Sequence, residues 1–93
     1  MNYAESFWQS EAWKEYESLQ EEKATLKKVN KLLMGIMRNG YECSYGKVEM
    51  LKGDFSGYAS VRIDKKNRII FSVDDNKVTV IQCGRHYDYN ERS

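Results

Sequence analysis

Residues 58–83 hold the feature that most limits what this 93-residue chain can fold into. Three strand-like runs, rich in Val, Ile, Phe and Tyr, are separated by the short polar segments Asp-Lys-Lys-Asn and Asp-Asp-Asn-Lys. Turns of this length join antiparallel neighbours, because a parallel pair needs a crossover of roughly a dozen residues or more. The segment therefore predicts an antiparallel meander with strands at 58–63, 68–73 and 78–83.

Side chains in a strand point alternately to its two faces, so the same runs predict which residues are buried. The apolar face of the first two strands is expected to comprise Ala59, Val61, Ile63, Ile69, Phe71 and Val73. The opposite face receives Arg62 and Arg68. We therefore expect helices to cover the apolar face and a concave basic surface to form on the other.

Two helical segments precede the strands. Ser10 is interpreted as an N-cap, and apolar residues then recur at helical spacing as far as Leu19. A second, clearer helix is predicted from about residue 21 to 38, with Asn39-Gly40 ending it. The apolar positions of this second helix are Leu26, Val29, Leu33, Ile36 and Met37.

Short strands are also expected at residues 2–8 and 48–51. Together these elements predict an α+β fold, with two N-terminal helices packed on a twisted, mostly antiparallel sheet of four to five strands. The length fits a single domain spanning residues 1–93. No apolar run approaches the roughly 20 residues that span a bilayer, so we expect no membrane association and a cytoplasmic location.

The two cysteines are too few for a disulfide framework. The chain also lacks the second pair of cysteines that would suggest a zinc site. Cys83 falls in a strand-like run, which predicts a buried thiol, whereas Cys43 falls in a polar loop and is expected to be exposed. No metal site and no cofactor is predicted.

The net charge of +1 hides an asymmetry. Residues 1–22 have a net charge of −5 and residues 23–93 a net charge of +6, so a polyanion is repelled by the first part and attracted by the second. The lysines of the second helix, Lys23, Lys27, Lys28 and Lys31, could contact RNA or an acidic partner. They could equally form the solvated side of a core helix.

The carboxylate of Glu49, a series of basic side chains and the single histidine, His86, follow one another through the last half of the chain. A carboxylate, an arginine and a histidine can supply a base, a charge stabiliser and an acid, the groups that cleave RNA without a metal. The alternatives to a catalytic role are that Glu49 is only a surface carboxylate, and that Arg68 only pairs with Asp64 across a hairpin.

The sequence words L-K-G-D-F-S-G-Y-A-S-V-R-I, N-R-I-I-F-S-V and V-I-Q-C-G-R-H-Y resemble the YoeB-type branch of the RelE superfamily. The helical segments E-A-W-K-E-Y and K-K-V-N-K-L-L extend the resemblance over nearly the whole chain. It implies a toxin of a bacterial type II toxin–antitoxin pair that cleaves mRNA on the ribosome without a metal. It also implies a cognate antitoxin, operator DNA bound only through the antitoxin complex, and pairing of some members as homodimers.

The resemblance also implies roles for individual residues. Glu49 matches the family's base, Arg68 its transition-state arginine, His86 its acid and Tyr87 its terminal aromatic. The candidate substrate-binding residues are Lys47, Lys52 and Arg62. In such a reaction the ribose 2′-OH attacks the adjoining phosphodiester, giving a cyclic phosphate and a free 5′-OH.

The chain departs from the family pattern at three places. The loop before Glu49 lacks prolines, Val61 stands where an arginine is often found, and residues 88–93 extend beyond Tyr87. Two other functions stay open. The missing arginine at Val61 and the altered loop keep open a catalytically silent toxin homologue that acts with its antitoxin as a DNA-binding co-repressor. The basic sheet face and the many tyrosines keep open an RNA-binding module.

Overall fold

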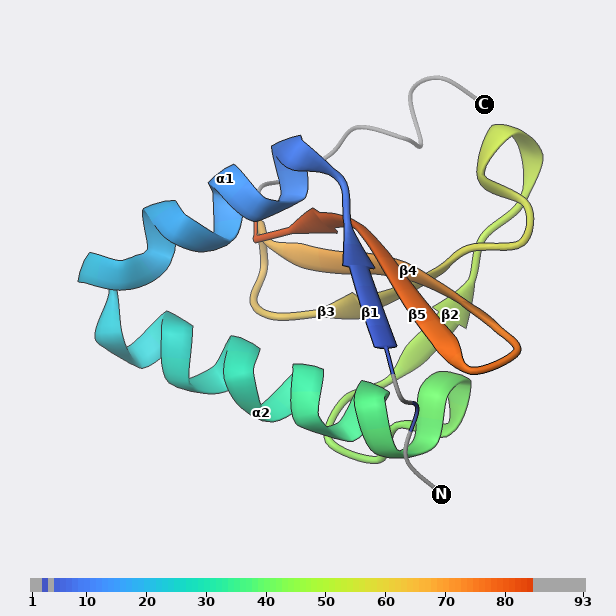
Figure 1. Cartoon of the computed structure of the whole chain (residues 1–93). Helices are drawn as coiled ribbons and strands as arrows, with labels where there is room; N and C mark the ends of the chain where they lie inside the picture. The colour runs from blue at the N-terminus through green and yellow to red at the C-terminus, as the bar shows by residue number, and fades with distance from the viewer. Residues whose placement is uncertain (1–2, 4, 85–93) are drawn as a thin grey trace.

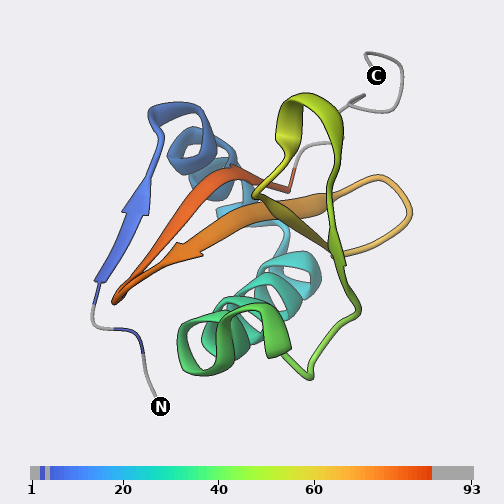
Figure 2. The ribbon, with the colours of Figure 1, turned by 90° about the vertical axis from the view of Figure 1, so that its right-hand side faces the viewer.

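The computed structural model describes residue 3 and residues 5–84. The elements in chain order are β1 (Glu5–Trp8), α1 (Ser10–Ser18), α2 (Lys23–Asn39), β2 (Val48–Met50), β3 (Ala59–Arg62), β4 (Arg68–Asp74) and β5 (Lys77–Cys83). This part of the chain also contains three short 3-10 turns, η1 (Leu19–Glu21), η2 (Gly40–Glu42) and η3 (Gly53–Phe55). The two helices lie together beside the sheet, and Figures 1 and 2 show this arrangement from two sides.

Within the described residues, five strands form one mixed sheet in the order β1-β5-β4-β3-β2. The pairs β2–β3, β3–β4 and β4–β5 are antiparallel, as the short turns require. β1 pairs with β5 in parallel, and both helices occur in the long chain segment that separates these two strands. The predicted fold, two helices on a mostly antiparallel sheet, is confirmed.

The ends of the helices differ in detail from the prediction. Ser10 is the first residue of α1 and not its N-cap; that position belongs to Gln9, whose side chain makes no capping hydrogen bond. α2 starts at Lys23 because the η1 turn intervenes between the helices. Its end is as predicted: Gly40 adopts a φ of +59°, in the left-handed region that glycine tolerates.

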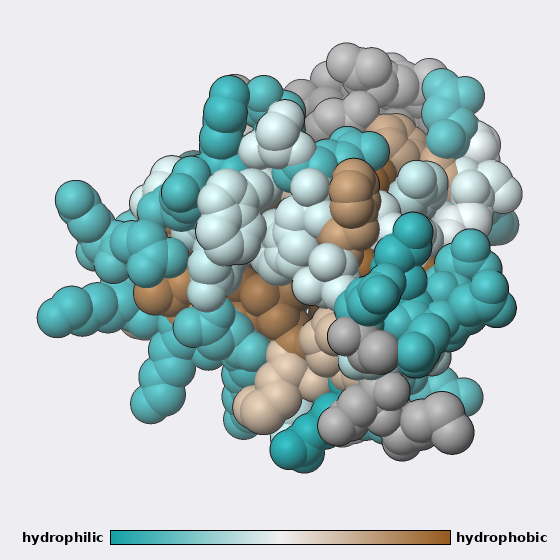
Figure 3. Space-filling view, in the orientation of Figure 1, coloured by the Kyte–Doolittle hydropathy of each residue, from teal (hydrophilic) through white to brown (hydrophobic). Residues whose placement is uncertain are grey.

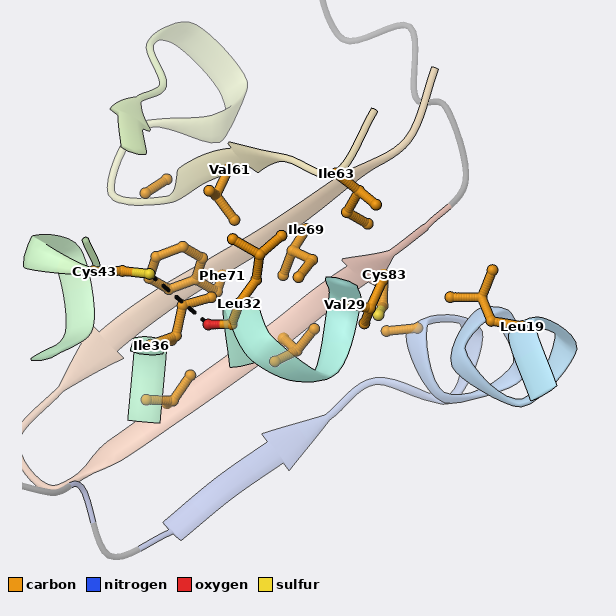
Figure 4. Close-up of a cluster of buried hydrophobic side chains, with 14 residues drawn as sticks. Leu19, Val29, Leu32, Ile36, Cys43, Val61, Ile63, Ile69, Phe71 and Cys83 are labelled. Atoms are coloured by element: carbon orange, nitrogen blue, oxygen red, sulfur yellow. Dashed lines mark hydrogen bonds between the residues drawn. The ribbon is translucent and has the colours of Figure 1, made fainter. Parts of the chain in front are cut away.

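The core lies between α2 and the sheet. Val29, Leu32 and Ile36 of α2 face Val61 and other strand residues in Figure 4, and all of these side chains are buried. The predicted apolar face is buried at Ala59, Val61, Ile63, Ile69 and Phe71, while Val73 is half-buried. The prediction omitted Leu32, which is 1% exposed, in favour of Leu26, Leu33 and Met37, which lie at the edge of the core.

Both cysteines are buried. This confirms the prediction for Cys83, whose pKa is raised to about 12 by burial and by the nearby Glu15 carboxylate, so its thiol stays protonated at neutral pH. The prediction for Cys43 was wrong. Its loop folds back beneath α2, where the Cys43 thiol lies 3.8 Å from the Leu32 carbonyl oxygen and donates a weak hydrogen bond to it (Figure 4).

Across the described part of the chain, every helix is too short or too polar to traverse a lipid bilayer. In the view of Figure 3, hydrophobic atoms gather at the centre of the face, between the helices and the edge strand β1. Hydrophilic side chains surround them. They are prominent over both helices, consistent with the charged residues that point away from the core there.

Candidate functional site

The sheet register brings the candidate residues of three strands together. Glu49 of β2 pairs with Ser60 of β3, and Arg62 of β3 pairs with Arg68 of β4. Directly paired residues project from the same face, and Ser60 and Arg62 are two positions apart. Glu49, Ser60, Arg62 and Arg68 therefore share the face opposite the α2 core, as alternation predicted for the two arginines.

Arg68 is the best-fixed side chain of this group. Its Nη1 atom donates a hydrogen bond to Ser60 Oγ at 3.3 Å and lies 4.0 Å from Glu49 Oε1. The Arg68 side chain is 19% exposed, against 53% for Glu49. The guanidinium is thus held in place while the carboxylate beside it stays open to solvent and to a ligand.

Asp64 does not take the place of Glu49 as the partner of Arg68. Its carboxylate accepts hydrogen bonds from the backbone N–H groups of Lys66 and Asn67, both at 2.8 Å, and from Asn67 Nδ2 at 2.9 Å. Slight burial tends to raise the pKa of Asp64, but these hydrogen bonds and the charge of Lys28 lower it overall. Asp64 therefore shapes the hairpin that leads into Arg68.

A pocket of about 390 Å³ lies around the Glu49–Arg68 pair. Among the described residues, its lining consists of Lys28, Tyr45, Gly46, Lys47, Glu49, Arg62 and Arg68, so four cationic side chains of this part of the chain surround one carboxylate. The volume is within the roughly 300–1,000 Å³ common for ligand sites, and the positive charge favours an anion. Such a site could bind a phosphodiester and place a carboxylate against it.

The pocket contains four of the seven candidate site residues named from the sequence. Lys52 precedes the η3 turn and does not contribute to the lining. His86 and Tyr87 lie outside the described residues. Within residues 5–84 and residue 3, no cluster of three or more His, Cys, Asp or Glu side chains could hold a metal ion.

Three lining residues were not among the predicted site residues. Lys28 reaches the pocket from α2, and Tyr45 and Gly46 reach it from the loop before β2. The charge pattern of the second helix pointed toward Lys28, but nothing in the local sequence shows where the loop lies. Ser60, which adds no charge to the site but holds Arg68 through a hydrogen bond, was given no role in the sequence analysis.

The loop before Glu49 contains no proline, and its packing against the core positions Glu49 instead. A Cβ atom added at Gly46 would lie 2.7 Å from Val61 Cγ2 and 2.8 Å from Leu32 Cδ2, so the loop presses directly on the core. Cys43 anchors the other end of the loop through burial under α2. Val61 itself is fully buried. Its side chain lies on the core face of the sheet, opposite the face that carries Glu49.

Solved structures of very different sequence define the fold class. YafQ from E. coli strain BL21(DE3) is 15% identical, with a TM-score of 0.73 over 86% of this chain and 90% of that one. A toxin from Helicobacter pylori, solved as a copper-bound mutant, is 14% identical, with a TM-score of 0.74 over 92% and 96% of the two chains. The fold is thus one that small bacterial toxins adopt.

The family follows from closer matches. Residues 8–87 match the model of the YoeB-like toxin of bacterial type II toxin–antitoxin systems, and the chain belongs to that family. Toxin YoeB of Escherichia coli K12 is 36% identical over 81 residues, which cover 86% of this chain and 95% of the relative. A YoeB/ParE toxin from Agrobacterium tumefaciens is 34% identical with a TM-score of 0.82, over 90% of this chain and 100% of that one.

A solved YoeB–YefM toxin–antitoxin heterotetramer from Staphylococcus aureus contains a chain that is 37% identical to this one. Its TM-score is 0.80, over 88% of this chain and 95% of that chain. The resemblance inferred from the sequence words is therefore confirmed. The protein is the toxin component of a type II toxin–antitoxin system.

Proposed function

We propose that this toxin is an endoribonuclease that cleaves mRNA on the ribosome without a metal ion and so inhibits translation. The observation that carries the proposal is the Glu49–Arg68 pair, with Nη1 and Oε1 4.0 Å apart, on the wall of a pocket rich in cations. A base and a guanidinium at this separation can act on the two ends of one ribose–phosphate linkage.

In the proposed reaction Glu49 removes the proton of the ribose 2′-OH, and the resulting oxygen attacks the adjoining phosphorus. Arg68 stabilises the charge that develops on the phosphate oxygens, since its planar fork of donors matches two of them. The hydrogen bond from Arg68 to Ser60 supports this role because it holds the guanidinium before the substrate arrives. The products are a 2′,3′-cyclic phosphate and a free 5′-OH.

The remaining roles come from the family resemblance. His86 is proposed to protonate the departing 5′ oxygen, because an imidazole with a reference pKa of about 6.5 exchanges protons readily near neutrality. Tyr87 is proposed to stack on a base or orient the phosphate. Lys47 and Arg62 line the pocket and are proposed to bind substrate phosphates, with Lys52 just beyond the end of β2.

The open geometry of the pocket supports dependence on the ribosome. Glu49 is half-exposed, so this face gives an RNA strand little steric guidance. General acid–base catalysis supplies only about 10²–10⁴-fold acceleration, whereas alignment of nucleophile and leaving group can supply far more. We infer that the ribosome provides this alignment by holding the mRNA in a reactive conformation.

The test is cleavage of mRNA on translating ribosomes. The toxin is treated with excess chelator and separated from it before mixing, so that the ions the ribosomes need are left in place. Glu49→Gln, Arg68→Ala and His86→Ala should each reduce cleavage at least about 100-fold. Lys14→Ala, on an exposed part of α1 paired with Glu11, should cleave like the unaltered protein. Full activity in Arg68→Ala, or loss of activity after chelation of the toxin, would contradict the proposal.

We also propose that a cognate antitoxin binds and disables this toxin, and that operator DNA is bound only through that complex. The S. aureus relative supports this, since it was solved with YefM as a heterotetramer and separately as a YoeB dimer. A homodimer is proposed on the same ground. Expression of the toxin alone should arrest growth, and co-expression of the antitoxin should relieve the arrest. A silent co-repressor or a simple RNA-binding module would leave growth unchanged.

A further inference from the structure

A second pocket adjoins the one around Glu49 and Arg68. It has a volume of about 330 Å³ and is lined by Ala24, Lys27, Lys28, Lys31, Leu32 and Tyr45. Lys28 and Tyr45 line both pockets. The two hollows therefore adjoin one another across these two side chains, and we call the second one the α2 groove.

Tyr45 is the aromatic wall between the two hollows, and it is held firmly there. A Cβ atom at Gly35 of α2 would lie only 2.8 Å from Tyr45 Cδ2, so the ring packs into a notch that exists because residue 35 has no side chain. Burial of Cys43 and the tight fit of Gly46 fix the backbone on both sides of Tyr45. Tyr45 is nevertheless 42% exposed.

Among the described residues, the charged side chains that line the second pocket are all lysines. Lys31 Nζ lies 5.0 Å from the centre of the Tyr45 ring, a cation–π contact. Lys27 and Lys31 are four residues apart and thus neighbours on the helix surface, where like charges destabilise a helix slightly. The sequence of α2 from Lys23 to Asn39 contains no acidic residue that could offset them. An ordinary solvated helix face mixes both signs, so this one is suited to a polyanion.

We propose that Tyr45 stacks on a base of RNA and that Lys27 and Lys31 bind its phosphates, so that the α2 groove is an RNA-binding site that adjoins the cleavage site. The inference deepens the proposed function and rests on RNA being the substrate. A positively charged groove with an exposed, rigid aromatic ring is the arrangement that binds single-stranded nucleic acid. Two sources of this chemistry exist: the mRNA strand that flanks the cleavage site, and ribosomal RNA beside it.

The test measures binding rather than cleavage. The full-length toxin is titrated with a short 2′-O-methyl oligoribonucleotide, which lacks the nucleophile, and separately with ribosomes that carry no mRNA, each at several salt concentrations. The variants are Lys27→Ala/Lys31→Ala and, as a charge-matched control outside the groove, Lys14→Ala/Lys77→Ala. Tyr45→Phe keeps the ring. Tyr45→Leu keeps an apolar group in the Gly35 notch without the ring, and thermal unfolding checks that each variant is folded.

For the RNA that occupies the groove, removal of two lysine–phosphate contacts should lower the slope of log affinity against log salt by about 1.4 relative to the control. Tyr45→Leu should bind this RNA about 5- to 150-fold more weakly than Tyr45→Phe, the loss of one stacked base. A response to the oligonucleotide identifies the groove as the path of the mRNA, and a response only to ribosomes identifies ribosomal RNA.

The proposal is overturned if the Lys27→Ala/Lys31→Ala variant binds both RNAs as the control does, or if Tyr45→Leu binds both as Tyr45→Phe does. Because binding is read separately from cleavage, the two proposals can fail independently. If the groove variants cleave mRNA and bind RNA as the controls do, the RNA-binding role of the groove is contradicted and the nuclease proposal stands. If RNA binding depends on the groove but the unaltered toxin cleaves no mRNA, the nuclease proposal is contradicted and the RNA-binding site stands.

Discussion

The two loops on either side of β2 are fixed by different means, although both border the strand that carries Glu49. The upstream loop, residues 43–47, is held by packing: Cys43 is buried and Gly46 leaves no room for another atom. The downstream loop, residues 51–58, is held by turn geometry. Gly53 and Gly57 adopt φ values of +67° and +93°, and an added Cβ would meet nothing within 4 Å at either position.

The difference indicates which loop determines the position of Glu49. In a packed interior, the addition or removal of even one methylene group displaces neighbouring atoms. An exposed turn, in contrast, can change shape without moving its neighbours. The upstream loop contacts Val61 and Leu32, which are part of the core, and it also presents Tyr45 to the α2 groove. The downstream loop arches away from α2 in Figure 2. We therefore expect the upstream loop to matter most for the site.

Gly46→Ala should have the largest effect. Its Cβ would lie 2.7 Å from Val61 Cγ2, so either the core or the loop must shift, at a cost of about 1–3 kcal/mol in the free energy of unfolding. A shift of the loop would also displace Glu49, three residues further on, and reduce mRNA cleavage. Chemical denaturation and the ribosome cleavage assay measure the two effects.

Gly53→Ala is the matched control in the downstream loop. It introduces the same methyl group into open space, so its cost is only that of a left-handed φ, about 1–2 kcal/mol. Cleavage should remain close to that of the unaltered toxin. Equal losses of cleavage in Gly46→Ala and Gly53→Ala would contradict the distinction between the two loops.

Tyr41→Phe should have the next largest effect, on the downstream loop and on Val73 of β4 but not on the upstream loop. The Tyr41 hydroxyl accepts a hydrogen bond from the Val73 N–H at 2.8 Å and donates one to the Gly57 carbonyl oxygen at 3.2 Å. The ring stacks on Phe71 and would stay in place. Loss of the hydroxyl leaves the Val73 N–H unpaired, which should cost about 1–2 kcal/mol. Hydrogen exchange should then increase at residues 55–58 and at Val73, while exchange in residues 43–47 stays unchanged.

Cys43→Ala should have a smaller effect, of about 1 kcal/mol, because it removes one buried sulfur atom and leaves a small cavity under α2. The loss should appear in the upstream loop, with faster hydrogen exchange at residues 43–47. Cys83→Ala removes the same atom from β5, which two strands separate from β2, and serves as the control. An upstream loop that exchanges alike in both variants would show that Cys43 does not anchor it.

The sequence was sufficient for the features that depend on local pattern. Alternation and short turns predicted the meander and its two faces, because a residue's face in a strand depends only on its parity. Arg62 and Arg68 were placed together for this reason. The predictions that were wrong depended on contacts between residues far apart in the sequence. The burial of Cys43 and Leu32 follows from how the loop folds beneath α2. Tyr45 reaches the site only because α2 packs alongside this end of the sheet.

The β3–β4 hairpin, which leads into Arg68, is a third connection and should give the smallest effect. Its turn is held by hydrogen bonds to the Asp64 carboxylate, so it resembles the downstream loop in depending on polar contacts and not on packing. The pKa of Asp64 is lowered in the folded protein. Its contribution to stability is therefore present above the unfolded pKa of about 3.9 and is lost as the pH falls through the folded value.

Asp64→Asn tests this contribution, since the amide keeps one acceptor oxygen but cannot titrate. The unaltered protein should lose more free energy of unfolding than the variant when the pH is lowered from about 6 to about 3. The difference should be under about 1 kcal/mol, because the carboxylate is exposed and solvent screens its interactions. Parallel pH profiles for the two proteins would mean that the turn does not depend on the charge of Asp64. In that case Arg68 is positioned by its strand and by Ser60 alone.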